Sequence, residues 1–249
     1  MLQARRSTIP GRKHKMVFVD FGNPYLRGYL AHGYCDAHRR HLDAIRARLP
    51  GWAADARASE AYSGRPPRPL AAVLDIDEVI LCNIHMNSFQ APAGAQGPDP
   101  VDFHASDYFL GPDGNRWPRE DLRLNPLLPG ARDLLAEIRD LGIELFLITG
   151  RLESIRDETV ENFIHVGLTG GPDHIIPVEL ITRRDGALIM CPDAERPLPG
   201  ASIRPWKEGR RAIIDRTHRI IINVGDQISD LGLYGDSQIH CPHPYYWTP

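Results

Sequence analysis

Two aspartates, Asp75 and Asp77, lie two residues apart at the end of an apolar run, Leu70–Ile76, that is typical of a strand buried on both faces. Paired carboxylates at a strand end suit phosphoryl transfer, because one can attack phosphorus while the other moves protons. We expect Asp75 to form an aspartyl-phosphate, and Asp77 to protonate the departing alcohol and later to deprotonate the attacking water. An isolated pair of this kind is usually a turn or a helix cap, so the hypothesis depends on its companions.

Two companion motifs could bind the phosphate. Thr149 and Gly150 follow a second apolar run, Ile143–Ile148, and offer a hydroxyl group and backbone N–H groups near a helix start, where a phosphate oxygen can bind. Lys207 would direct a compact positive charge at the same oxygens and at the aspartyl-phosphate. Arg151 fits two interpretations equally well, a phosphate contact or a salt bridge to the edge of the sheet.

A third companion motif, Gly-Asp-Gln-Ile-Ser-Asp at 225–230, follows the apolar run Arg219–Val224. Carboxylates that face a phosphate dianion repel it, and a hard divalent cation held by oxygen ligands offsets that repulsion. Proteins bind Mg²⁺ through one or two carboxylates together with water and substrate phosphate, which fits Asp75 with Asp226. The sequence therefore predicts a Mg²⁺ cofactor at this place.

The elements that must position these motifs alternate between strand and helix patterns. Helical patterns or helix start and stop signals occur at Pro24–Leu49, Leu134–Leu141 before Gly142, Glu153–Val166 before Gly167, and from about Trp206. Strands that alternate with helices of about a dozen residues form mostly parallel sheets with right-handed crossovers. We predict an α/β fold with a doubly wound, mostly parallel, Rossmann-like sheet and helices on both of its faces.

Two further segments carry weaker predictions. Val178–Thr182 and Ala187–Met190 flank an Asp185-Gly186 turn, a pattern that predicts a β-hairpin. Residues 86–127 are rich in Gly, Pro, Asp and aromatic residues and are too long for an ordinary connection, so we expect a small cap over the carboxyl ends of the strands.

The length and composition fit one domain with this insertion. The chain has 249 residues, of which 42% are hydrophobic, enough to bury one full α/β core. Residues 1–20 are expected to be a flexible leader, and residues 21–249 a single domain with the cap insertion at about 86–127.

The overall charge argues against polymeric or membrane partners. The net charge is −3, which gives no broad attraction to a nucleic acid polymer or to a membrane, and the basic residues within 1–20 are interpreted as a solvated tail. No apolar stretch reaches the roughly 18 residues that a membrane span needs. Four widely separated cysteines fit reduced thiols, so a cytoplasmic protein is expected. The sequence leaves open whether the protein forms a homo-oligomer.

Taken together and in this order, the four motifs resemble those of the haloacid-dehalogenase-like superfamily. Within it, the chain resembles the acid phosphatase branch that includes plant vegetative storage proteins and bacterial class C acid phosphatases. The segments that carry this resemblance are Asp75-Ile76-Asp77-Glu78 with Asn83, the run 146–151, Thr159 with Asn162, the run 225–231, and Cys241–Tyr246.

The resemblance implies a role for each motif residue. It makes Asp75 the nucleophile, Asp77 the acid and base, and Lys207 the residue that steadies the intermediate. It adds the backbone carbonyl of Asp77 and the side chain of Asp226 as metal ligands, with Asp230 supporting the metal. Val79 stands where threonine is common in this branch, which the superfamily pattern permits.

The sequence thus favours a Mg²⁺-dependent phosphomonoesterase, a hydrolase acting on a small-molecule phosphate ester such as a nucleotide or a biosynthetic intermediate. Two alternatives stay open. One is a phosphotransferase that uses an acceptor alcohol in place of water, and the other is a non-enzymatic storage or binding protein with the same fold. The aromatic residues of the cap match no substrate signature.

Overall fold

The computed structural model describes residues 35–82, 125–171, 174–197 and 201–242, together with the backbone of two short strands at 108–110 and 116–118. The predicted leader, most of the predicted cap and the last residues of the chain lie outside the described residues.

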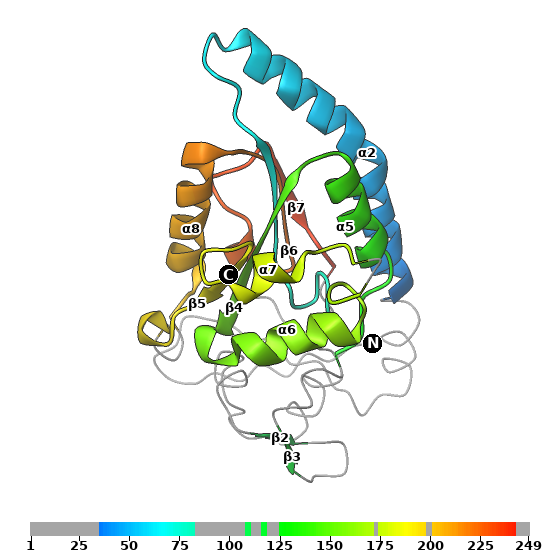
Figure 1. The fold of residues 1–249 in the computed structure, drawn as a ribbon, viewed down its shortest axis with the longest axis vertical. Coiled ribbons are helices and arrows are strands. Elements are labelled where there is room, and N and C mark those ends of the chain that lie inside the picture. The colour runs from blue at the N-terminus through cyan, green and yellow to red at the C-terminus, as the bar shows by residue number, and fades with distance from the viewer. Residues whose placement is uncertain are drawn as a thin grey trace, which may run out of the picture.

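Five parallel strands form the sheet, in the order β5-β4-β1-β6-β7 (Figure 1). The central strand is β1, which pairs with β4 on one side and with β6 on the other. The edge strands are β5 and β7. The bounds are β1 Leu70–Leu74, β4 Glu144–Leu152, β5 Leu188–Cys191, β6 Arg219–Gly225 and β7 Ser237–His240.

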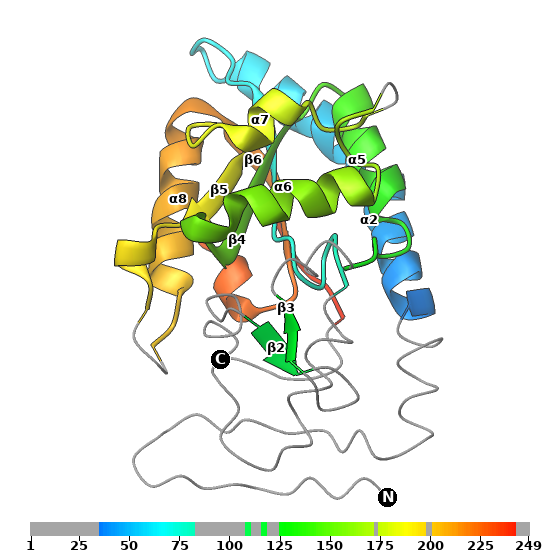
Figure 2. The ribbon, with the colours of Figure 1, turned by 60° about the horizontal axis from the view of Figure 1, so that its bottom comes forward.

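Helices cover both faces of this sheet, as predicted. The helices are α2 Cys35–Tyr62, α5 Ala131–Asp140, α6 Arg156–His165, α7 Val178–Thr182 and α8 Arg204–Thr217. Figures 1 and 2 show α8 on one side of the sheet, and α2 and α5 on the other.

The side chains of β1 explain this layering. Ala72 and Leu74 belong to the larger core, into which α2 and α5 pack, whereas Ala71 and Val73 belong to a smaller core with Ile214 of α8. All five residues of β1 are buried, because successive side chains point to opposite faces and both faces are covered. The apolar run before Asp75 therefore reports a central strand.

Helix α2 extends beyond the predicted end at Leu49. It continues through Pro50 to Tyr62, while residues 24–34 of the predicted helix lie outside the described residues. The apolar stripe of Leu42, Ile45 and Leu49 is continued by buried Ala53 and Ala56. Proline removes one backbone hydrogen bond, but Pro50 is exposed, where water can replace that bond.

The predicted hairpin at 178–190 is wrong. Val178–Thr182 is the short helix α7, and β5 pairs in parallel with β4. Pro177 presets the start of the helix, and Ile181 is buried in the larger core, so tertiary packing overrides the β-branched composition. Gly186 lies against the backbone of Leu180, where an added Cβ would be 2.2 Å from the Leu180 carbonyl oxygen.

A small antiparallel ribbon lies within the segment predicted as a cap. It pairs β2 Tyr108–Leu110 with β3 Arg116–Pro118 and is separate from the main sheet. Both views place it beyond the carboxyl end of β1 (Figures 1 and 2). Among the described residues, none of the helices has both the length and the apolar character that crossing a bilayer requires.

Candidate active site

The motif residues come together at the carboxyl ends of the three central strands. Asp75 follows β1, Thr149 lies in the last part of β4, and Asp226 follows β6. The backbone N–H of Asp75 donates to the carbonyl oxygen of Val224 at 3.0 Å, which ties the first motif to the fourth. Open α/β sheets bind ligands at this edge.

Three carboxylates form what we term the acidic cluster, made of Asp75, Asp226 and Asp230. One oxygen of each lies within 4.8 Å of the others, and all three residues are buried. Burial in a medium of low polarity disfavours charged groups, and mutual repulsion adds to that cost. A buried cluster of this kind needs positive charge nearby.

Lys207 supplies one such charge from the first turn of α8. Its Nζ lies 3.2 Å from Asp75 Oδ2 and also contacts Asp230 Oδ1. Burial opposes the charged form of this lysine, but the carboxylates of Asp230 and Asp75 outweigh it and raise the pKa of Lys207. The lysine therefore stays protonated between the two aspartates.

The acidic cluster still carries more negative charge than Lys207 balances. Burial and the nearby carboxylate of Asp230 raise the pKa of Asp75 to about 7, although Lys207 acts in the opposite direction. Burial and the carboxylates of Asp230 and Asp75 also raise the pKa of Asp226 well above its usual range. Both shifts express the cost of holding like charges together out of water.

One oxygen of the acidic cluster is left without a hydrogen bond. Asp75 Oδ1 is buried and has no hydrogen-bond partner among the described residues. Buried polar atoms are normally paired, so an exception needs an explanation. An oxygen-only donor set with excess negative charge and one unpaired oxygen fits a hard divalent cation such as Mg²⁺.

Asp77 faces a different partner. Arg151 donates from Nη2 to Asp77 Oδ1 at 2.6 Å and from Nε to both carboxylate oxygens at 3.2 and 3.1 Å. The arginine is fully buried, whereas the Asp77 side chain is 20% exposed. Of the two interpretations of Arg151, the structure contains a salt bridge, but to Asp77 and not to the edge of the sheet.

Further hydrogen bonds fix the position of Arg151. Its Nη1 donates to Thr159 Oγ1 at 3.2 Å, and the Thr159 hydroxyl donates to the carbonyl oxygen of Ile155 at 2.9 Å. The backbone N–H of Arg151 donates to Thr149 Oγ1 at 3.1 Å. Arginine bound in this forked manner holds a carboxylate in one orientation.

The loop after Asp77 is held by a buried histidine from α2. Glu78 has a φ of 57°, in the left-handed region, and its carbonyl oxygen lies 3.1 Å from His38 Nε2. The backbone N–H of Glu78 donates to the carbonyl oxygen of Leu81 at 2.8 Å, and the backbone N–H groups of Ile80 and Leu81 donate to the carbonyl oxygen of Ile76. Burial lowers the pKa of His38 to about 4, so the histidine is neutral here.

The fourth motif is folded around Asp230. The backbone N–H of Gln227 donates to Asp230 Oδ2 at 3.0 Å, and Gln227 Nε2 donates to Asp226 Oδ2 at 2.8 Å. The first of these bonds is one half of a capping box at the start of the short 3₁₀ helix η6, Ile228–Asp230, and in the other half the Gln227 side chain accepts from the backbone N–H of Asp230. Gly225 is required, since an added Cβ would lie 1.9 Å from the Cβ of Asp230.

The structure thus brings Asp75, Asp226 and Asp230 together, with Lys207 in contact with the first and the last of them, and places Asp77 beside Arg151. Sequence reasoning left two buried neighbours unassigned. Arg211 follows Lys207 by one helical turn, a spacing that puts both on one face of α8 and could have identified it. His38 had no such signal, because its contact to Glu78 depends on how α2 packs.

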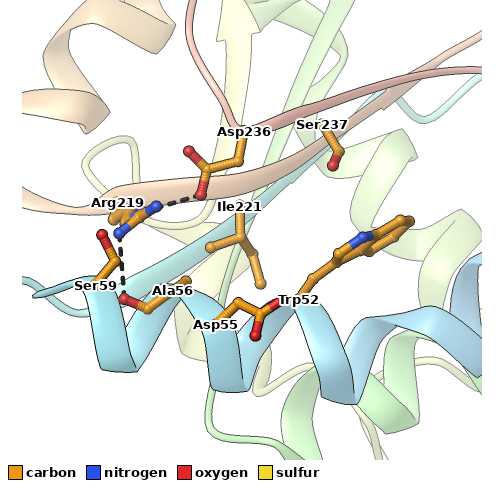
Figure 3. A pocket seen from close by; sticks show the side chains of 8 residues that line it. All are labelled: Trp52, Asp55, Ala56, Ser59, Arg219, Ile221, Asp236 and Ser237. Carbon is orange, nitrogen blue, oxygen red and sulfur yellow. Dashed lines mark hydrogen bonds and ion pairs between the residues drawn. The ribbon is translucent and has the colours of Figure 1, made fainter.

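A separate cavity of about 330 Å³ lies between α2 and the starts of β6 and β7 (Figure 3). Its lining consists of Trp52, Asp55, Ala56, Ser59, Arg219, Ile221, Asp236 and Ser237. None of the motif residues lines it. The cavity lies at the amino ends of β6 and β7, whereas the acidic cluster lies at the carboxyl end of the sheet.

Comparison with known proteins gives three findings. The family model of the HAD superfamily, subfamily IIIB (acid phosphatase), matches residues 48–249. Acid phosphatase 1 from Solanum lycopersicum is 28% identical over 188 residues, which cover 70% of this chain and 58% of the tomato protein. The chain therefore spans less than two thirds of the length of that relative.

The third finding concerns the fold. The class C acid phosphatase from Bacillus anthracis aligns with a TM-score of 0.52 at 20% identity, over 83% of this chain and 68% of the bacterial one. The tungstate-bound form of the same enzyme gives the same values. This likeness extends to the fold of the parallel sheet and its helices.

Proposed function

Because the chain belongs to the HAD superfamily, subfamily IIIB (acid phosphatase), we propose that it is a Mg²⁺-dependent phosphomonoesterase that acts through an aspartyl-phosphate on Asp75. The observation that carries this proposal is the acidic cluster, in which Asp75 Oδ2 lies 3.2 Å from Lys207 Nζ and Asp75 Oδ1 has no hydrogen-bond partner in the described part of the chain.

Mg²⁺ would be held by the carboxylates of Asp75 and Asp226 and the backbone carbonyl of Asp77, with Asp230 supporting them. When bound, it supplies the positive charge that lets a phosphate dianion approach these carboxylates. Lys207 already adjoins Asp75, so it is placed to stabilise negative charge on the transferred phosphoryl group. Thr149 and Gly150 are proposed to bind its remaining oxygens.

In the first step, a carboxylate oxygen of Asp75 forms a bond to phosphorus as the ester P–O bond breaks. Asp77 donates a proton to the departing oxygen, which leaves as an alcohol. Asp77 begins this step as the carboxylic acid, and Arg151 holds its carboxyl group in a fixed orientation for that transfer.

In the second step, Asp77 removes a proton from a water molecule, and the water oxygen attacks phosphorus. The bond between phosphorus and Asp75 breaks, which releases inorganic phosphate and restores the carboxylate. The proton that Asp77 gave to the alcohol is thereby regained from water, so the enzyme returns to its starting state.

Transfer to an acceptor alcohol is the second candidate, since an alcohol could replace water in the second step. The intact set of Asp75, Asp77, Lys207 and Asp226 supports catalysis over a storage role. We propose a small phosphate ester as substrate, with residues 86–127 closing over it, and no nucleic acid or membrane partner. The wide separation of the four cysteines in the sequence is what supports our proposal of a reducing, cytoplasmic compartment.

The test is phosphate release from p-nitrophenyl phosphate and from a panel of nucleotides and sugar phosphates, with Mg²⁺ and after exhaustive chelation. We expect activity that chelation abolishes and that added Mg²⁺ restores. Including glycerol as an acceptor separates hydrolysis from transfer, because transfer produces glycerol phosphate. Equal activity after chelation would contradict the metal assignment, and no release from any ester would favour the storage role.

A further inference from the structure

Arg211 is one of the largest fully buried side chains among the described residues, and the proposed reaction does not use it. It is 1% exposed and lies one turn after Lys207 on α8. A buried guanidinium is costly unless its N–H groups are satisfied. The places where those groups donate therefore indicate what the residue does.

The guanidinium of Arg211 joins α8 to β6 and to the fourth motif. Its Nη2 donates to the carbonyl oxygen of Asp230, its Nη1 to that of Ser229 at 3.3 Å, and its Nε to Asn223 Oδ1 at 3.2 Å. All these acceptors are oxygen atoms of the protein, so Arg211 is placed to shape the loop and not to bind substrate.

Two cations of α8 therefore contact Asp230, one at its side chain and one at its main chain. Lys207 contacts its carboxylate, and Arg211 contacts its carbonyl oxygen. The other carboxylate oxygen accepts the backbone N–H of Gln227, which precedes η6. The side chain that Asp230 contributes to the acidic cluster therefore depends on where Arg211 holds the main chain.

Glu208, which lies beside Arg211, makes a second connection between α8 and the chain that follows Asp230. Glu208 Oε2 accepts from Arg211 Nη1 at 3.4 Å, and Oε1 accepts the backbone N–H of Leu233 at 2.5 Å. Gly232 lies so close that an added Cβ would be 2.1 Å from Glu208 Oε2. Glu208 and Arg211 together fix both ends of the segment 229–233.

We infer that Arg211 is a positioning residue that sets the affinity of the acidic cluster for Mg²⁺ by fixing the main chain at Ser229 and Asp230. The inference rests on the proposed function, since it concerns the same metal site. Residues behind metal ligands typically change metal affinity by about 10- to 100-fold when they are altered. Arg211 has the burial and the hydrogen bonds of such a residue.

The test compares Arg211→Lys with a matched control, Arg210→Lys. Arg210 neighbours Arg211 on α8, but its guanidinium pairs with Glu195 at 3.1 Å and lies over the ring of Trp206 at 5.4 Å. Lysine keeps the charge of Arg211 but concentrates its N–H donors on one nitrogen, so it lacks the planar, forked guanidinium that reaches acceptors on α8, β6 and the fourth motif. We expect Arg211→Lys to raise the Kd for Mg²⁺, measured by isothermal titration calorimetry, by about tenfold or more. Arg210→Lys should leave that Kd unchanged.

Kinetics give the second measurement. At saturating Mg²⁺, the KM of Arg211→Lys for p-nitrophenyl phosphate should stay near that of the wild type, because the loss is in metal binding. The second variant is Glu208→Gln. Glu208 is partly exposed and contacts Arg211, and we expect its substitution to raise the Mg²⁺ Kd by a smaller factor. If Arg211→Lys fails to fold by circular dichroism, Glu208→Gln decides the question.

An unchanged Mg²⁺ Kd in the folded Arg211→Lys, or in Glu208→Gln where it must decide, would overturn the inference. A rise in Kd of the same size in Arg210→Lys would overturn it too, because the effect would then be general to α8. Failure of the proposed function looks different, since the wild-type protein itself would then neither bind Mg²⁺ nor release phosphate.

Discussion

The two ends of the sheet hold their charges in opposite ways. At the amino end, Arg219 Nε lies 2.9 Å from Asp236 Oδ2, and Nη1 donates to the carbonyl oxygen of Ala56 at 3.2 Å (Figure 3). Glu60 lies 3.7 Å from the same arginine and 3.2 Å from Arg68. At the carboxyl end, Lys207 pairs with two of the three buried carboxylates, those of Asp75 and Asp230, and Asp75 Oδ1 has no hydrogen-bond partner among the described residues.

This difference supports our assignment of the acidic cluster, and not of the charged residues at the amino end, as the functional site. Arg219 and Asp236 are balanced and partly exposed, so they need nothing further, even though a cavity of about 330 Å³ adjoins them. A buried excess of one charge is costly and persists only where it serves a purpose. The candidate site is therefore identified by its buried excess of negative charge and not by the volume of a cavity.

The largest expected effect comes from Asp75→Asn. Removing the nucleophile should lower kcat for p-nitrophenyl phosphate by about 10⁴-fold or more. The same change removes a buried charge, so the melting temperature of the metal-free protein should rise or stay constant. Assays and thermal denaturation of the purified variant test both. A variant within tenfold of wild-type activity would remove Asp75 from its proposed role.

Asp77→Asn should have an effect that depends on the leaving group. Esters of alkyl alcohols need a proton, so their hydrolysis should fall by about 10²- to 10⁴-fold. The nitrophenyl ester needs none and should suffer much less. Comparing kcat for the two esters tests the separate tasks of Asp75 and Asp77, and equal losses would contradict that separation.

The positions of Asp75 and Asp226 were predictable because each of them follows a strand that is buried on both faces. Leu70–Leu74 and Arg219–Gly225 are apolar enough to identify two of the central strands, and the polar residues that follow them must then meet at one edge. The short helix α7 was not predictable, because its β-branched residues favour a strand and only the burial of Ile181 decides otherwise.

The partners within the site required the three-dimensional structure. The sequence left Arg151 undecided, because the residue that it faces, Asp77, follows a different strand. The carbonyl oxygens that accept from Arg211 belong to the backbone, which carries no signal in the residue types. The same holds for His38 and the carbonyl oxygen of Glu78.

Acid titration should expose the support that His38 gives to the carboxyl end. Its folded pKa is about 4, against an ordinary value of 6.5. Between these values His38 binds a proton in the unfolded chain but not in the folded protein, so the contribution of His38 to the free energy of unfolding should fall by about 3 kcal/mol as the pH drops from 6.5 to 4. Above pH 6.5 this contribution is fully present.

Urea denaturation across that pH range tests the effect of His38. His38→Gln keeps a donor for the carbonyl oxygen of Glu78 and should flatten the dependence of stability on pH. The control is His174→Gln, which alters an exposed histidine and should leave the dependence unchanged. Identical curves for wild type and His38→Gln would contradict the prediction.

The smallest effect is expected at the amino end. Asp236→Asn breaks a partly exposed ion pair with Arg219, and such pairs contribute about 0 to 1 kcal/mol. We expect unchanged kcat and KM and a loss of stability no larger than that, which added salt should reduce further. A clear loss of phosphatase activity would mean that this cavity communicates with the acidic cluster.

The strand order has a consequence for how the chain is made. β1 and β6 lie side by side, although β4 and β5 come between them in the sequence. During translation, β1 can pair with β4 before β6 has been synthesised. The other edge of β1, whose sequence is Leu-Ala-Ala-Val-Leu, is then unpaired. An open apolar strand edge is a template for aggregation. Ribosomal pausing or truncation before residue 219 should therefore yield insoluble protein, and not merely an inactive phosphatase.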